Sequence, residues 1–163
     1  MNLYFLRHAI AIPRGTSGYK DVNRPLTKDG IRKMKEIAEG MRCLELDFDR
    51  IVSSPLLRAR QTAEIAANVF NQDLEIWKSL HPSEDPRKLI STLRKSNDQN
   101  ILLVGHEPHF SQFISVLTSG GADVQIDFKK GGLCKLTTDD LIYGRCAFLQ
   151  WLLAPAQLRK FRR

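Results

Sequence analysis

Short apolar runs alternate along the chain with segments in which apolar residues recur every three or four positions. The apolar runs have strand length, and we predict strands at Leu3–Arg7, Arg50–Ser53, Leu74–Trp77, Ile101–Gly105, Leu133–Thr137 and Cys146–Leu152. The periodic segments predict helices after Thr27, after Ser54-Pro55, over about Pro86–Lys95, and after Pro108. Strands that alternate with helices indicate a mostly parallel sheet covered on both faces.

Two of these helices begin with recognisable signals. Thr27 is a candidate N-cap for the first helix, because its hydroxyl can accept a backbone N–H of the first turn. Ser54 followed by Pro55 is typical of an N-cap and a first-turn proline, so we expect Ser54 to cap the second helix.

The last two predicted strands have no helical pattern between them. Asp139-Asp140 and Gly144 indicate tight turns there, which favours antiparallel pairing at that end of the sheet. A chain of 163 residues fits one domain. We therefore expect a single domain over residues 1–163: a three-layer α/β/α sandwich with a six-stranded, mostly parallel sheet and one antiparallel strand toward an edge.

Composition narrows the classes of partner. The net charge is +7, and Arg159, Lys160, Arg162 and Arg163 supply four of these charges in a terminal tail that we interpret as solvated or helix-ending. Because no nucleic-acid-binding motif accompanies the charge, we expect no nucleic-acid partner. No apolar run approaches the ~20 residues that span a bilayer, so we expect no membrane partner either.

The first residues and the cysteines suggest a location. The start of the chain lacks the basic lead of a signal peptide and is interpreted as the first strand. Cys43, Cys134 and Cys146 form no CxxC pair, which predicts free thiols in a reducing cytoplasm.

Two of the four histidines follow apolar strands directly. Arg7-His8 ends the first strand, and Gly105-His106 ends the fourth. Ligands of open α/β sheets bind at this carboxyl edge. A neutral imidazole can accept a phosphoryl group, and an adjacent guanidinium can hold phosphate oxygens. Gly105 would permit a ligand to approach the backbone closely.

Arg58 lies in the first turn of the second predicted helix, at the carboxyl end of a strand. A cation is mildly unfavourable at a helix N-terminus unless an anion binds there. This position favours a phosphate-binding role over a merely solvated one. The long polar stretch Ala9–Pro25, which begins right after His8, is a further candidate for function because loops of this length in small domains usually have one.

Three segments in this order resemble the histidine phosphatase superfamily: Leu6-Arg7-His8-Ala9, Ser54–Thr62 and Gly105-His106. Asn23–Gly30, the short length, and Trp151–Pro155 with Leu158 resemble the SixA-type phosphohistidine phosphatases within it. The resemblance implies a phosphoglycerate mutase-like fold and a cytoplasmic hydrolase of signal transduction. Its partner would be a phosphorylated histidine protein, or alternatively a small phosphate ester, and the chain would act as a monomer without cofactor or metal.

The resemblance also implies roles for residues. His8 would be the nucleophile, and Arg7, Arg58 and His106 would bind the phosphoryl oxygens. Ala9 stands where the superfamily usually has glycine.

Arg24 and Glu84 each have two possible roles. Arg24 would close over the phosphate or support the turn at Pro25. Glu84 is a candidate general acid, with Asp85 and His81 beside it, although Asp85 before Pro86 is typical of a helix cap. A phosphohistidine leaves as imidazole and needs little help from an acid, so the absence of an obvious acid favours a phosphoramidate substrate.

Other phosphatase classes fit poorly. A cysteine phosphatase needs an arginine six positions after its thiol, where this chain has Asp49, Asp140 and Leu152. Asp47-Phe48-Asp49 resembles the aspartate pair of magnesium-dependent phosphatases but precedes its strand, so we interpret it as a turn. A small-molecule phosphatase of the same superfamily and a non-catalytic phosphate-binding module remain alternatives.

Overall fold

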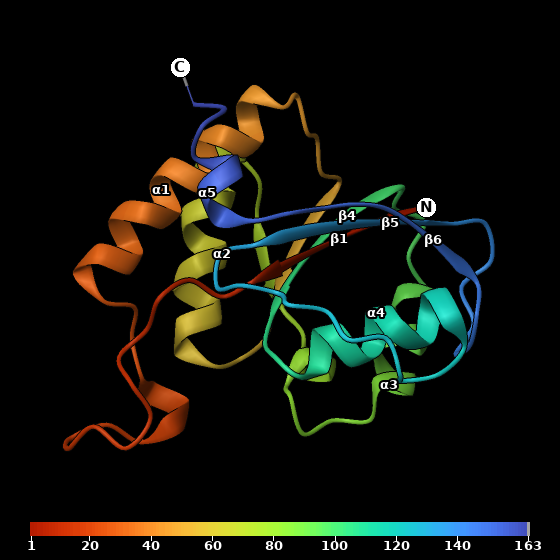
Figure 1. The fold of residues 1–163 in the computed structure, drawn as a ribbon, viewed down its shortest axis with the longest axis horizontal. Helices are drawn as coiled ribbons and strands as arrows, with labels where there is room; N and C mark the ends of the chain where they lie inside the picture. Colours follow the sequence, from red (N-terminus) through yellow and green to blue (C-terminus); the bar gives the residue numbers. More distant parts are fainter. Residues whose placement is uncertain (163) are drawn as a thin grey trace.

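The computed structural model describes residues 1–162, which form one six-stranded sheet with helices on both faces (Figure 1). The strands are β1 (Asn2–Arg7), β2 (Arg50–Ser53), β3 (Leu74–Ile76), β4 (Asn100–Gly105), β5 (Leu133–Thr138) and β6 (Ala147–Leu153). The α-helices are α1 (Lys28–Cys43), α2 (Leu57–Phe70), α3 (Pro86–Leu93), α4 (His109–Ser119) and α5 (Pro155–Leu158). Two 3-10 turns, η1 (Asp21–Asn23) and η2 (Lys78–Leu80), complete the elements. The predicted strands and long helices are confirmed within a few residues, whereas α5 was not predicted.

The strand order is β3-β2-β4-β1-β5-β6. β1, β2, β3 and β4 pair in parallel, and β5 pairs antiparallel with both β1 and β6. β5 is therefore the one strand that runs against the others, and it lies next to an edge. This confirms the expected mixed sheet.

The alternation of side chains along β1 explains why helices cover both faces. Tyr4 and Leu6 point into one core with α1 and α2, while Leu3 and Phe5 point into the other with α3 and α4. Figure 1 shows these helix pairs on opposite sides of the sheet, with α5 beside α1. A strand buried on both faces must be apolar throughout, which is why β1 gave such a clear sequence signal.

The central pair β1–β4 positions the carboxyl edge. Arg7 stands opposite Gly105 in the parallel register, and the His8 backbone N–H donates to the Gly105 carbonyl at 2.9 Å. The two histidines that follow these positions therefore leave the sheet side by side.

The two predicted caps have different outcomes. The Thr27 hydroxyl accepts the Gly30 N–H at 2.9 Å, which confirms the N-cap of α1. The prediction for Ser54 was wrong, because α2 begins at Leu57 after Leu56, with no side-chain cap. Ser54 instead directs its hydroxyl to His106, where a buried imidazole needs a partner.

The basic tail begins at the end of α5, where Arg159 is the C-cap, and two of its side chains contact α1. Arg159 follows α5 and its Nε contacts the Glu36 carboxylate at 2.6 Å, while Arg162 Nη1 contacts the same carboxylate at 3.0 Å. Two of the charges therefore dock on α1, and Arg163 lies outside the described residues.

Cys43, Cys134 and Cys146 are all free. Within residues 1–162, no helix combines the length and the apolar character that crossing a bilayer requires.

Gly30 allows α1 to pack against the segment that follows His8. A Cβ at this position would overlap the Ile10 carbonyl oxygen, which also accepts the Thr27 N–H at 3.0 Å. We predict that Gly30→Ala lowers the free energy of unfolding by about 1–3 kcal/mol through overpacking, despite the better helix propensity of alanine. Chemical denaturation measures this. Gly144→Ala is the control, since its Cβ would meet only Ile142 Cδ1 at 4.0 Å; equal stabilities of the two variants would contradict the prediction.

Candidate active site

His8 and His106 lie together at the carboxyl edge of the sheet, as predicted. Their ring centroids are 5.1 Å apart, and their side chains are almost buried, at 7% and 2% exposure. Each leaves the end of a central parallel strand, so the sheet fixes their relative position. The pair forms the centre of the candidate site.

The hydrogen bonds of His8 define which ring nitrogen can react. Nδ1 lies 2.8 Å from the carbonyl oxygen of Ala9, and a carbonyl can only accept. Nδ1 therefore carries the proton and donates it, which leaves a lone pair on Nε2. The Ala9 N–H is held in turn by the Thr62 hydroxyl at 3.0 Å, so α2 fixes the segment that orients the ring.

Burial keeps His8 neutral. Removal from water is the main cause that lowers its pKa, to about 3; the hydrogen bond to Ala9 opposes this, and the charges of Arg58, Arg7 and Lys130 lower the pKa further. At neutral pH the ring is a neutral nucleophile surrounded by cations. This is the state that attack on a phosphoryl group requires.

His106 is held from one side only. Its Nε2 lies 2.8 Å from the Ser54 hydroxyl, and its Nδ1 is buried with no hydrogen-bond partner among residues 1–162. Ser54 Oγ also accepts the Leu56 N–H at 3.4 Å, and in the tautomer in which the hydroxyl donates to Nε2 the ring proton lies on Nδ1. Burial is the main cause that lowers the pKa of His106, to about 2, and repulsion between the two imidazoles when both are protonated lowers it further. His106 can thus donate to an anion without itself being charged.

Arg7 is anchored by the loop that precedes β5. Its Nη1 donates to the Phe128 carbonyl at 2.5 Å, and its own carbonyl accepts the Gly131 N–H at 3.0 Å. Its Nε is buried and unpartnered within the described part of the chain. The anchored guanidinium therefore keeps donor capacity free beside His8.

Arg58 occupies the first turn of α2, as predicted, and is 3% exposed. Its Nη1 donates to the Asp21 carbonyl at 2.8 Å, and its Nη2 lies 3.4 Å from the Asp21 carboxylate. Its Nε, like that of Arg7, has no partner in residues 1–162.

Three of the buried polar atoms without partners thus belong to the predicted phosphate binders: Arg7 Nε, Arg58 Nε and His106 Nδ1. Buried donors are rarely left unpaired, because the desolvation of each costs about 1–3 kcal/mol. The charges of both arginines act on the pKa of His8, which places them within electrostatic reach of its ring. The arrangement fits an anion that binds against His8 and accepts these donors.

Three contributors to the site were missed in the sequence. Thr62 accepts from Ala9 and donates to the Arg58 carbonyl at 2.7 Å, so it links the two central segments. Ser54 was interpreted as a cap. Lys130 is largely exposed. Partial burial of its ammonium group, together with the charges of Arg7 and other arginines, lowers its pKa, so it is a further cation near the site. The basic pair before two glycines was the only local signal for Lys130.

Arg24 is held within the loop. Its Nη1 donates to the Ile12 carbonyl at 2.5 Å, and its Nε donates to the Asp21 carboxylate at 3.0 Å. These bonds support a role in shaping the loop, and a direct contact with phosphate stays a prediction.

Glu84 is bound by Lys88, whose Nζ lies 2.6 Å from the carboxylate. That hydrogen bond lowers the pKa of Glu84, which makes it a poorer acid at neutral pH. Asp85 caps α3 by accepting the Arg87 N–H at 2.9 Å, as its position suggested. The role of Glu84 as general acid stays a prediction.

Two other sequence interpretations can be compared with the structure. Gly105 was expected to let a ligand approach, but a Cβ there would lie 2.5 Å from Cζ of the Phe110 ring, so the glycine makes room for the core. Asp49 accepts the backbone N–H groups of Gln99 and Asn100, each at 2.8 Å, so it has a structural role that ties the start of β2 to the start of β4.

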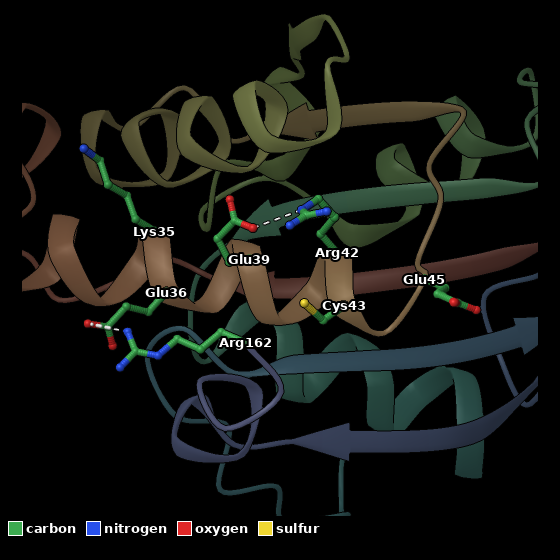
Figure 2. Close-up of a pocket in the computed structure, with 7 residues that line it drawn as sticks. All are labelled: Lys35, Glu36, Glu39, Arg42, Cys43, Glu45 and Arg162. Atoms are coloured by element: carbon green, nitrogen blue, oxygen red, sulfur yellow. Dashed lines mark hydrogen bonds and ion pairs between the residues drawn. The ribbon is translucent and has the colours of Figure 1, made fainter.

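A hollow of about 720 Å³ lies elsewhere, on the outer side of α1. Figure 2 shows its lining side chains, in which Arg42 pairs with Glu39 and Arg162 with Glu36. None of the predicted site residues lines it. In residues 1–162, no group of three or more His, Cys, Asp or Glu side chains is placed to hold a metal ion.

Comparisons with known proteins agree with this geometry. The model of the family described as "Histidine phosphatase superfamily (branch 1)" matches residues 3–82, a stretch that contains Arg7, His8 and Arg58. An uncharacterised protein of Picosynechococcus sp. is 35% identical over 140 residues, covering 83% of this chain and 84% of the relative. The phosphohistidine phosphatase SixA of Escherichia coli is 24% identical over 164 residues, covering 98% and 97%.

The fold is also found among solved structures. The protein histidine phosphatase SixA complexed with tungstate superimposes with a TM-score of 0.84 at 23% identity, covering 97% of this chain and 99% of that one. This likeness confirms the expected phosphoglycerate mutase-like fold, including the half that carries His106. With the sequence matches and the paired histidines, it leads to one assignment: the chain belongs to the histidine phosphatase superfamily.

Proposed function

We propose that this protein is a metal-independent phosphatase that transfers a phosphoryl group to His8 and acts on a phosphorylated histidine of a partner protein. The observation that carries the proposal is the neutral, buried His8, with its Nδ1 proton held by Ala9 and its Nε2 lone pair free among unpartnered cationic donors. Membership of the superfamily supports the phosphatase reaction.

In the proposed reaction, the Nε2 lone pair of His8 forms a bond to phosphorus as the substrate's phosphorus–nitrogen bond breaks. The bonding electrons return to the substrate's imidazole, which leaves as a neutral ring when its other nitrogen is protonated. Arg7, Arg58 and His106 neutralise the charge on the transferring oxygens.

Water then attacks phosphorus, and the electrons of the phosphorus–nitrogen bond return to Nε2 of His8. The hydrogen bond from Nδ1 to the Ala9 carbonyl keeps a proton on the far nitrogen, so His8 also leaves as a neutral imidazole. The phosphate carries away the proton of the water or passes it to solvent. The same backbone carbonyl therefore supports both halves of the cycle.

The choice of a phosphoramidate over a phosphate ester rests on the missing acid. Within residues 1–162, the hydrogen-bond partners of the two rings are the Ala9 carbonyl and the Ser54 hydroxyl, and the Glu84 carboxylate is bound by Lys88. An alkoxide leaving group needs a proton donor at the bond that breaks, whereas the substrate's imidazole takes its proton from solvent on the far ring nitrogen and needs no acid at the breaking bond. A small phosphate ester is the alternative substrate.

A substrate panel tests this choice. We expect a phosphohistidine protein to be hydrolysed with a higher kcat/KM than alkyl phosphomonoesters, and we expect EDTA to leave the rate unchanged. Release of inorganic phosphate is the measurement. Preference for an alkyl ester would favour the small-molecule alternative, and loss of activity in EDTA with recovery in magnesium would contradict the metal-independent mechanism.

The phosphoenzyme tests the nucleophile. We predict that alkaline quenching traps phosphate on Nε2 of His8, because Nδ1 is occupied by its hydrogen bond. Phosphopeptide mass spectrometry locates the residue, and NMR of the phosphopeptide distinguishes the two nitrogens. His8→Ala should lose roughly 10³-fold or more of the turnover and all labelling. A labelled residue other than His8 would overturn the assignment.

A matched arginine pair tests the phosphate binders. Arg58→Ala should lower kcat about 10²- to 10³-fold by removing a donor to the transition state. Arg60→Ala removes an exposed arginine two residues further along α2 and should leave the rate within twofold of wild type. Steady-state kinetics on an aryl phosphate separates them, and equal losses would contradict the role of Arg58.

The buried histidines also predict how stability depends on pH. Because folding lowers the pKa of His8 and His106 below 6.5, the unfolded chain binds more protons as pH falls below that value. The stability is fully present above about pH 6.5 and decreases toward acid, by up to about 1.4 kcal/mol per pH unit for each histidine. Thermal unfolding between pH 7 and pH 5, in buffers without phosphate, measures it. His106→Asn should give a shallower slope, and a flat wild-type profile would contradict neutral burial.

A further inference from the structure

The carboxylate of Asp21 is surrounded by three arginines. It lies in η1, within the long loop after His8, and its Oδ1 accepts from Arg24 Nε at 3.0 Å and Arg14 Nε at 3.1 Å. Its Oδ2 lies 3.4 Å from Arg58 Nη2. Figure 1 shows this loop reaching the N-terminal end of α2, where η1 contacts the helix. A loop acid thus contacts a phosphate-binding residue of the site.

Asp21 contacts two of the three guanidinium nitrogens of Arg58. The Asp21 carbonyl accepts from Nη1 at 2.8 Å and the carboxylate faces Nη2, while Nε is buried and unpartnered in the described chain. Two contacts at one end of a planar guanidinium fix both its direction and its plane. The nitrogen left free is therefore presented in one orientation.

The positive charge of Arg58 is stabilised by the neighbouring Asp21 carboxylate. Arg58 lies in the first turn of α2, where the helix dipole disfavours a cation, and the side chain is nearly buried. Burial lowers the pKa of Arg58, and the charge of Asp21 opposes that shift. The carboxylate compensates the buried cation from the side of the loop.

Asp21 is itself held in place. The ends of its loop are tied by the Ile12 N–H to the Pro25 carbonyl at 2.9 Å, and Arg24 bridges the loop from Asp21 to the Ile12 carbonyl. Partial burial acts to raise the pKa of Asp21, but the hydrogen bond from Arg24 and the charge of Arg58 hold it below its ordinary value. The carboxylate is therefore an ionised group held by hydrogen bonds within its loop.

We propose that Asp21 is a positioning residue, which holds the guanidinium of Arg58 from the loop side so that its free Nε–H meets the transferring phosphoryl group. The inference rests on the proposed phosphatase reaction, because it assigns Arg58 to the phosphoryl oxygens. The proposal extends the site from the edge of the sheet to the loop. Arg24 then acts indirectly, because it holds Asp21, which in turn holds Arg58.

Asp21→Asn tests the proposal with inorganic vanadate as the probe and an aryl phosphate as the substrate, neither of which depends on the identity of a protein partner. We expect the variant to weaken vanadate binding and to lower kcat/KM by roughly 10- to 100-fold, as the misplacement of a catalytic group does. Asp21→Glu, which keeps the charge, should recover part of the loss. In an Arg58→Ala background, Asp21→Asn should have almost no further effect, because the two residues act through one contact.

Two controls separate positioning from charge and from folding. As a control for charge, Asp29→Asn makes the same change in net charge on the exposed side of α1 and should stay within twofold of wild type. As a control for folding, circular dichroism should give melting temperatures for Asp21→Asn and Asp29→Asn within a few degrees of each other.

The outcomes distinguish the hypotheses. Tighter vanadate binding by Asp21→Asn would mean that the Asp21 carboxylate competes with phosphate for Arg58. Unchanged binding would mean that Asp21 neither positions Arg58 nor competes with phosphate. Each result overturns the positioning role and leaves the phosphatase function standing. An equal loss in Asp29→Asn, or full additivity with Arg58→Ala, would also overturn it. Absence of both vanadate binding and hydrolysis in the wild-type protein would overturn the proposed function together with this inference.

Discussion

The parallel pairing of β1 with β4 is the constraint on which the site depends. With Arg7 opposite Gly105, the next residue of each strand is a histidine, and both rings leave the sheet at the same edge. A shift of one residue in either strand would move its side chains to the opposite faces, and each core is packed around the side chains that it now holds. The register of β1 against β4 therefore determines the distance between two polar rings beyond the strand ends.

Burial then sets the chemistry of those rings. The protein removes two imidazoles from water and places cations around them, which keeps both neutral at neutral pH. Burial has a free-energy cost, but it keeps the rings neutral. A neutral ring beside fixed positive charge is suited to receive an anionic phosphoryl group. Backbone carbonyls and hydroxyls from Ala9 and Ser54 hold the rings, so a charged carboxylate is not needed to orient either one.

Much of this arrangement could be predicted because its signals are local. Strand length, helical periodicity and the Thr27 cap each depend on residues close in sequence, and they identified the sheet, its antiparallel strand and the edge where His8 and His106 lie. The prediction for Ser54 was wrong because its hydroxyl satisfies a ring that is 52 residues away in the chain. Propensity for a cap could not anticipate a buried acceptor brought there by another strand.

The sequence by itself determined the order of elements, the histidines and arginines at strand and helix ends, and the family that they resemble. Only the tertiary structure decided which atoms are free to react: the Nε2 of His8, the Nδ1 of His106, and the Nε atoms of Arg7 and Arg58. It also decided that Asp21, an unremarked loop acid, faces Arg58 across 37 residues of chain. The physical reason is that hydrogen bonds and desolvation depend on which groups the packed strands and loops bring together, and no local pattern encodes those neighbours.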